Sequence, residues 1–143
     1  MEGKTSGRTV RVTLDRVQIL DRKEPFFDRW GEVRLRARVS TRGGEETVVE
    51  TTVPERGALR VAASGDVLEL DRVLFEGRVG DRLEIELAAV EVDSFSPDDA
   101  FQTYRRVHLM GPEGLSGDFG PGDESIDAEE LTDWRVWYRI EEV

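Results

Sequence analysis

The chain has 143 residues, 38% of them hydrophobic, which suits one domain with a real core. Its net charge of −11 repels nucleic acid and anionic lipid unless a cation inverts the local charge. It has no cysteine, which excludes disulfides, thiolate catalysis and cysteine zinc sites. It also lacks an apolar run of membrane-spanning length and an apolar signal core. We therefore expect a soluble, cytoplasmic protein, either whole or as one domain of a larger one.

The first strand is expected directly after a polar tail. Residues 1–8 are small and polar, and we expect them to be a loose tail before one domain over 9–143. The segment 9–20 alternates apolar and polar residues, which predicts a strand. Its apolar positions change phase once, which predicts a bulge or bend near Asp15–Arg16. These apolar positions are Val10, Val12, Leu14, Val17 and Ile19.

A loop and a hairpin follow the first strand. Residues 21–31 contain proline and glycine and are expected to form the loop. The segment 32–40 has the cleanest alternation in the chain and predicts a strand with arginines on its outer face. The TRGGEE sequence then predicts a turn into a β-branched strand over 47–53. The inward positions are Val33, Leu35, Ala37 and Val39, and the outward ones are Arg34, Arg36 and Arg38.

The second half of the chain adds strand-like segments and one long loop. No segment has a sustained helical period. The acidic, glycine-rich range 111–133 has little to bury, so we expect it to be a long loop and the most mobile internal segment. Seven to eight short strands with regular turn signals predict an all-β antiparallel sandwich. The strand-like segments are 66–79, 80–93, 101–110 and 134–143.

Basic and histidine residues are expected to have structural roles. The row of arginines on 32–40 is expected to pair with acidic rows such as Glu84 and Glu86 rather than to bind phosphate. His108 is the only histidine and shares a strand face with Tyr104 and Arg106. Because no second histidine and no serine or cysteine signature accompanies it, we expect neither catalysis nor zinc binding there. The chain is therefore expected not to be an enzyme.

The aromatic residues divide into two groups. The three tryptophans, Trp30, Trp134 and Trp137, are expected to close the core and the sheet ends rather than to line a ligand pocket. Phe26 and Phe27 lie in the predicted first loop between charged residues. They either insert into a membrane or partner, or tuck beneath their own loop, and the sequence leaves both interpretations open.

Acidic residues gather at two predicted loops. One loop joins the first two strands, and the other leaves the strand that ends near residue 93. Connections alternate between the ends of a sandwich, so both loops could share one end. Ca²⁺ takes six to eight oxygen ligands, which such carboxylates can supply. A solvated turn is the alternative. The candidate ligands are Asp21, Asp28, Glu91, Asp93 and Asp99, with Asp98 as a spare, and Asp118, Asp123 and Asp127 would form a second site if they converged.

The second of these loops resembles a known calcium-binding loop. The stretch EVDSFSPDDAFQTYRRV is similar to the third calcium-binding loop of C2 domains, which reads D-x-D-x5-D and leads into a strand. Here the pattern is Glu91-x-Asp93-x5-Asp99, with glutamate in place of the first aspartate. The stretch VRVTLDRVQILDRKEPFFDRWGEVRLRARV resembles the C2 opening of strand, aspartate loop and strand. In that resemblance, Asp21 and Asp28 take the two ligand places of the first loop.

The resemblance covers about half of the chain and implies a C2-like, eight-stranded sandwich. It also implies calcium-dependent binding of a lipid surface or of a protein. Two hypotheses follow. The first is a non-enzymatic calcium-binding β-sandwich module that mediates protein or lipid-surface interaction. The second is a metal-free acidic interaction or assembly domain. No nucleic-acid partner is expected, and the sequence leaves the oligomeric state open.

Overall fold

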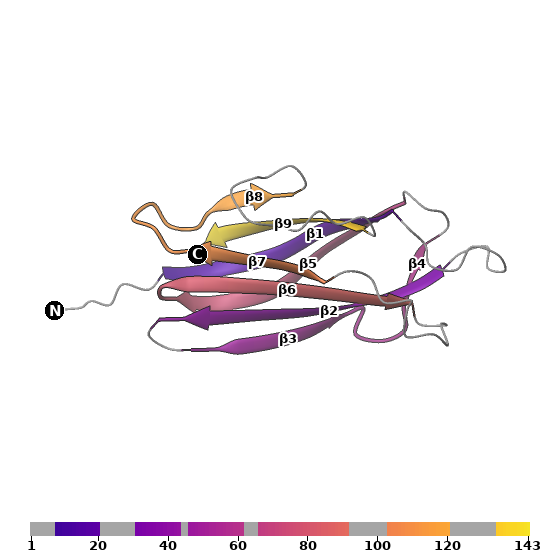
Figure 1. The fold of residues 1–143 in the computed structure, drawn as a ribbon, viewed down its shortest axis with the longest axis horizontal. Helices are drawn as coiled ribbons and strands as arrows, with labels where there is room; N and C mark the ends of the chain where they lie inside the picture. The colour runs from indigo at the N-terminus through magenta and orange to yellow at the C-terminus, as the bar shows by residue number, and fades with distance from the viewer. Residues whose placement is uncertain (1–7, 21–30, 44–45, 62–65, 92–102, 121–133) are drawn as a thin grey trace.

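The chain folds into two β-sheets that face each other (Figure 1). The computed structural model describes residues 8–20, 31–43, 46–61, 66–91, 103–120 and 134–143, and these contain nine strands and no helix. The predicted all-β antiparallel sandwich is confirmed. The number of strands exceeds the expected seven to eight because two have only three residues, too few to show alternation. The strands are β1 (Arg8–Ile19), β2 (Gly31–Arg42), β3 (Val48–Val53), β4 (Leu59–Val61), β5 (Val67–Val79), β6 (Arg82–Glu91), β7 (Tyr104–Leu109), β8 (Gly117–Phe119) and β9 (Trp134–Glu142).

Every strand pairing in the two sheets is antiparallel. Sheet A has the order β5-β1-β9-β8. Sheet B has the order β3-β2-β6-β7, and β4 pairs with the start of β2. In the described part of the chain, no helix is long and apolar enough to cross a membrane.

The core lies between the sheets and follows the predicted alternation. In β2 and β6, every second side chain points inward, and each of these is at most 2% exposed. The ladder between the two strands places Val39 beside Ile85 and Ala37 beside Leu87 on this inner face. The buried apolar side chains of β2 and β6 are Val33, Leu35, Ala37, Val39, Leu83, Ile85, Leu87 and Ala89.

Strand β1 contains the bulge that its change of phase predicts. The register shifts between Leu14 and Arg16 against both neighbours, β5 and β9. One extra residue, Asp15, is inserted there. It allows the apolar side chains on both sides of the bulge, from Val10 to Ile19, to stay fully buried. The outer face of sheet A thereby gains a carboxylate at its middle.

The range 111–133 is not a loop throughout. Its described part includes β8, which pairs with β9, and an isolated bridge between Gly111 and Gly114. Leu115 is only 7% exposed and joins the core. The expectation of a single long loop is therefore wrong for the first ten residues. The rest of the range and the predicted tail up to residue 7 lie outside the described residues.

We predict that Ile85→Asp unfolds the protein. Ile85 is fully buried in mid-strand, and a buried carboxylate without a partner costs several kcal/mol. Far-ultraviolet circular dichroism during urea titration would measure the change. Glu86→Ala, which alters the neighbouring outward position, is the control and should leave the urea midpoint nearly unchanged. A folded Ile85→Asp variant with a wild-type midpoint would contradict the placement of the core.

Candidate functional site

The predicted calcium ligands fall almost entirely outside the described residues. This holds for Asp21, Asp28, Asp93 and Asp99. Glu91 is the last residue of β6, and its backbone pairs with Val33. The described strands nevertheless fix the points at which the two predicted loops attach.

Those attachment points lie on adjacent strands at one end of the sandwich. The first loop enters β2 at Gly31, and the second leaves β6 at Glu91, which pairs with Val33, two residues further along β2. In sheet A, Ile19 pairs with Trp134, so segment 121–133 joins β9 at this end as well. This is the right-hand end in Figure 1. The prediction that the two loops begin from a common end agrees with the strand ladders.

Most of the chain's net charge belongs to two segments attached there. Segments 92–102 and 121–133 contain nine carboxylates and neither arginine nor lysine, against a net charge of −11 for the whole chain. The strands, in contrast, carry arginines and carboxylates in nearly equal number. We call the end of the sandwich at Ile19, Gly31, Glu91 and Trp134 the acidic end. The charge imbalance of the protein is thus a property of its connections and not of its sheets.

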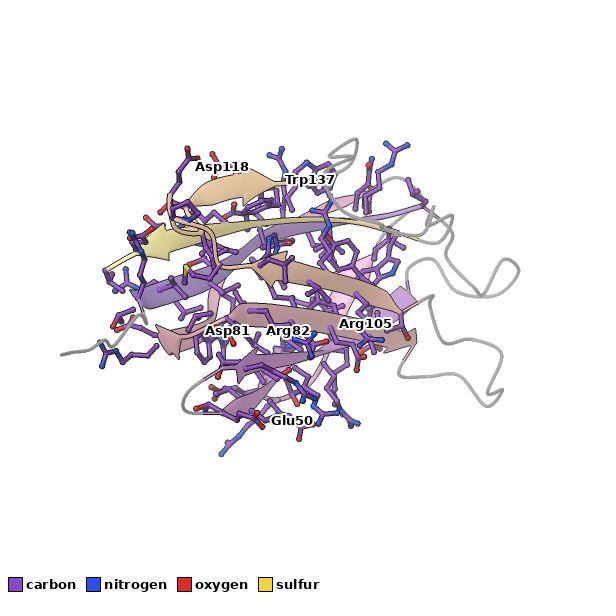
Figure 2. All side chains as sticks on the ribbon, turned by 60° about the vertical axis from the view of Figure 1, so that its left-hand side comes forward. Glu50, Asp81, Arg82, Arg105, Asp118 and Trp137 are labelled. Atoms are coloured by element: carbon purple, nitrogen blue, oxygen red, sulfur yellow. The ribbon has the colours of Figure 1, made fainter. Side chains whose placement is uncertain are left out.

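A separate acidic pocket of about 810 Å³ lies on the outer face of sheet A. Its carboxylates come from three strands, with Asp15 at the β1 bulge, Asp71 and Glu69 on β5, and Asp118 on β8. Asp71 has a left-handed backbone with φ of 46°, so the edge strand is also distorted at this level. Figure 2 shows Asp118 and Trp137 on this side of the molecule, away from Glu50 of β3.

Arg139 lines this pocket and makes several of its ion pairs. Its guanidinium pairs with Asp15, with Asp71 at 3.2 Å and with Glu141 at 3.4 Å. Beside it, the Arg16 guanidinium stacks over the ring of Trp137 at 4.8 Å from the centroid. Among the described residues, no group of three or more histidines and carboxylates could hold a metal. The pocket therefore contains an ion-pair network centred on one arginine, and its lining includes Asp118, which was a candidate ligand of the second site.

Partial burial raises the pKa of Asp15. The Arg139 guanidinium opposes this rise, whereas the carboxylates of Asp118 and Asp71 add to it. A raised folded-state pKa means that the folded protein holds this proton more tightly than the unfolded chain. The contribution of Asp15 to stability therefore falls as the pH rises from the ordinary aspartate pKa through the folded one. Sequence reasoning missed this network because its members are far apart in the chain.

Strand β7 buries its polar face. Tyr104, Arg106 and His108 are between 2% and 7% exposed, whereas Leu109 is 72% exposed. The sequence correctly places the three polar residues on one face, and the structure turns that face towards sheet A. His108 Nε2 lies 2.5 Å from the Tyr138 hydroxyl. The histidine therefore has a structural partner inside the core.

Aromatic rings complete the buried polar cluster. The His108 ring meets Phe119 edge-on, with centroids 4.5 Å apart, and Phe119 stacks on Tyr138 at 5.2 Å. Burial, together with nearby Tyr104, raises the pKa of the Tyr138 hydroxyl, although a hydrogen bond with Arg106 opposes the rise. Strand β8 thus covers the cluster through Phe119. Trp134 is fully buried, as expected for a core tryptophan, whereas Trp137 lies on the outer face beside Arg16.

The arginine row of β2 lies on the exposed face of sheet B, as predicted. Arg38 is flanked across the ladders by Glu86 of β6 and Glu50 of β3. The close ion pairs of Glu84, however, are with Arg105 at 3.2 Å and Arg42 at 3.8 Å. Charges therefore alternate across this face, although Glu84 pairs with arginines outside the predicted row.

We predict that Asp118→Asn lowers the pKa of Asp15. The substitution removes a negative charge that disfavours ionisation of Asp15 while leaving Arg139 in place. A pH titration of the carboxyl carbons by nuclear magnetic resonance would measure the shift. The loss of stability attributed to Asp15 with rising pH should also become smaller. Glu113→Gln, outside the pocket, is the control. An unchanged Asp15 titration in Asp118→Asn would show that the two carboxylates do not interact.

We predict that Tyr138→Phe destabilises the fold by about 1–3 kcal/mol, because it removes a buried hydrogen-bonding hydroxyl. The free energy of unfolding from urea titration is the measurement. His108→Leu combined with Tyr138→Phe should cost less than the sum of the single variants, since the double variant removes both polar partners. Strict additivity would mean that the two side chains contribute independently.

The fold and the candidate sites can now be compared with known proteins. No protein-family model matches this sequence, and no curated protein matches it either. One similar solved structure is described as human GIVD cytosolic phospholipase A2 in complex with methyl gamma-linolenyl fluorophosphonate inhibitor and terbium chloride. Its identity to this chain is 9% and its TM-score 0.49, and the match covers 96% of this chain. The chain spans only 18% of that structure's length, and a likeness at this level bears on neither family nor function.

Proposed function

We propose that this protein is a non-catalytic, C2-like β-sandwich module that binds Ca²⁺ at its acidic end and thereby engages a protein or a lipid surface. The observation that supports the proposal best is the ladder of β2 with β6, which attaches the two predicted ligand loops to adjacent strands. The proposed ligands are Asp21, Asp28, Glu91, Asp93 and Asp99.

The charge distribution also favours a cation at this end. The segments 92–102 and 121–133 together contain nine carboxylates, and neither segment contains an arginine or a lysine. Concentrating like charges raises the free energy of the folded state, and a divalent cation bound only to the folded state lowers it. Ca²⁺ suits such a set better than Mg²⁺, because it accepts more oxygen ligands and less regular geometry. The same cation would allow an acidic end to approach an anionic lipid surface.

The binding role is consistent with where the polar chemistry of the sandwich is found. The histidine and tyrosines that could act as acids or bases are buried between the sheets, with His108 only 7% exposed. The outer pocket holds two of its carboxylates, Asp15 and Asp71, against Arg139. In the described part of the chain, the lining of the outer pocket contains no histidine, serine or cysteine. The proposal therefore involves recognition and no chemical conversion.

We predict that Ca²⁺ raises the melting temperature of the wild-type protein by several degrees. At a concentration 100 times the dissociation constant, one bound ion adds about 2.7 kcal/mol to the free energy of unfolding. Mg²⁺ should add less, and Asp93→Asn combined with Asp99→Asn should abolish the increment. Differential scanning calorimetry and isothermal titration calorimetry would measure both effects.

The matched control is Glu76→Gln combined with Glu86→Gln. It removes the same charge from outward-facing positions of β5 and β6 and should keep the calcium response. If the wild type shows no Ca²⁺ binding heat, and melts in Ca²⁺ as it does in NaCl of equal ionic strength, the calcium proposal is wrong. Binding of a basic protein without Ca²⁺ would then favour the metal-free acidic interaction domain.

A further inference from the structure

The described sheets have five edge strands, and four of them, including the three-residue β4, have a feature that discourages pairing with another strand. In sheet A, β5 is distorted by the register shifts with β1 and by the left-handed Asp71, and β8 has only three residues. In sheet B, β7 points the charged Arg106 inward. Bulges, short strands and inward charges are recognised means of protecting a sheet edge.

Strand β3 has none of these devices. Its ladder with β2 runs over six pairs without a shift, and its sequence, VVETTV, has no proline and no basic residue. Val48 is 53% exposed, and Glu50, the sole charge, lies on the outer face of the sheet. Within the residues that the structure describes, nothing pairs with the free side of β3. A flat, β-branched edge of this kind is suited to adding a strand.

The ladder also shows which backbone groups this edge presents. The Thr41 amide donates to the Thr47 carbonyl oxygen at 2.9 Å, so the odd-numbered residues of β3 exchange hydrogen bonds with β2. In an antiparallel ladder, the alternate residues turn their N–H and C=O groups away from that partner. The outward groups are therefore those of Val48, Glu50 and Thr52.

We propose that β3 pairs with β3 of a second copy of this chain, antiparallel and about a twofold axis at Thr51. Glu50 of one copy would then exchange both backbone hydrogen bonds with Thr52 of the other. Shifting the axis to Glu50 would set two carboxylates directly opposite each other, which is unfavourable. In the Thr51 register, Val49 faces Val53 of the second copy, and both side chains extend the buried layer.

The charge of the protein is compatible with this arrangement. β3 runs towards the acidic end, since Val53 pairs with Leu35 near the start of β2. An antiparallel twofold therefore sends the acidic ends of the two copies in opposite directions. A parallel arrangement would place them side by side. The dimer joins two nearly neutral sheets into one continuous sheet and keeps the negative charge at its far corners.

Thr52→Pro tests the pairing directly. It removes one outward amide of β3 without removing a hydrogen bond to β2. An edge strand tolerates proline at a position whose amide points outward. The matched control is Val107→Pro, on the opposite edge of sheet B. There, the Met110 amide donates to the Asp81 carbonyl oxygen, so the even-numbered residues of β7 exchange hydrogen bonds with β6. The amide of Val107, an odd-numbered residue, therefore points outward. Size-exclusion chromatography with light scattering, in chelator, should show dimers for wild type and Val107→Pro and monomers for Thr52→Pro.

A crosslinking experiment covers the case in which a proline variant fails to fold. Residues facing each other at Thr51 would form a non-hydrogen-bonded pair with Cα atoms about 4.5 Å apart, within disulfide range. The chain has no cysteine, so Thr51→Cys should give a disulfide-linked dimer on mild oxidation. Val73→Cys, 47% exposed on β5, should stay largely uncrosslinked. A wild type that is monomeric at every concentration, or equal crosslinking of the two cysteine variants, would overturn the proposal.

Discussion

The ladder between β2 and β6 is the interaction on which the rest of the structure depends. It runs from Val33 opposite Glu91 to Arg42 opposite Arg82 without a shift. Because side chains alternate with a period of two, a slip of one residue would expose the buried row of β6, including Ile85. The same slip would shift the starting points of the two predicted ligand loops relative to each other. One register therefore determines both the core of sheet B and the geometry of the acidic end.

The sequence predicts those parts of the fold in which apolar side chains point into the core and polar side chains point outward. The alternation of β2 and the change of phase in β1 identified buried positions and the bulge at Asp15, because apolar side chains there face the core. In β7 the polar face is buried, so alternation showed which residues share a face but not which face points inward. β8 was missed because GDF is too short to have a period. The pocket around Arg139 was missed because it depends on the bulge and on contacts between β1, β5, β8 and β9.

Positive and negative charges nearly balance on the sheets of this protein, whereas its excess negative charge lies in the connections between strands. On the sheets, arginines lie next to carboxylates on neighbouring strands, as with Arg105 and Glu84 or Arg11 and Glu76. Exposed pairs of this kind add little stability individually, but they leave the sheet faces nearly neutral. The uncompensated carboxylates belong to connections attached at one end. Salt should therefore act more on the repulsion among the carboxylates of the acidic end than on the sheet faces.

The first and last described strands, β1 and β9, are neighbours, which determines how the sandwich responds to attachment or force at Arg8 and Val143. The Val143 amide donates to the Thr9 carbonyl oxygen at 2.9 Å, and Arg8 and Val143 lie at the end opposite to the acidic one (Figure 1). A tether at these two points would fasten the sandwich by one end and direct the acidic end outwards. Tension between the same points would load the β1–β9 hydrogen bonds one after another rather than all together. Under force, the unit would open progressively, from the end that carries Arg8 and Val143 towards its acidic end.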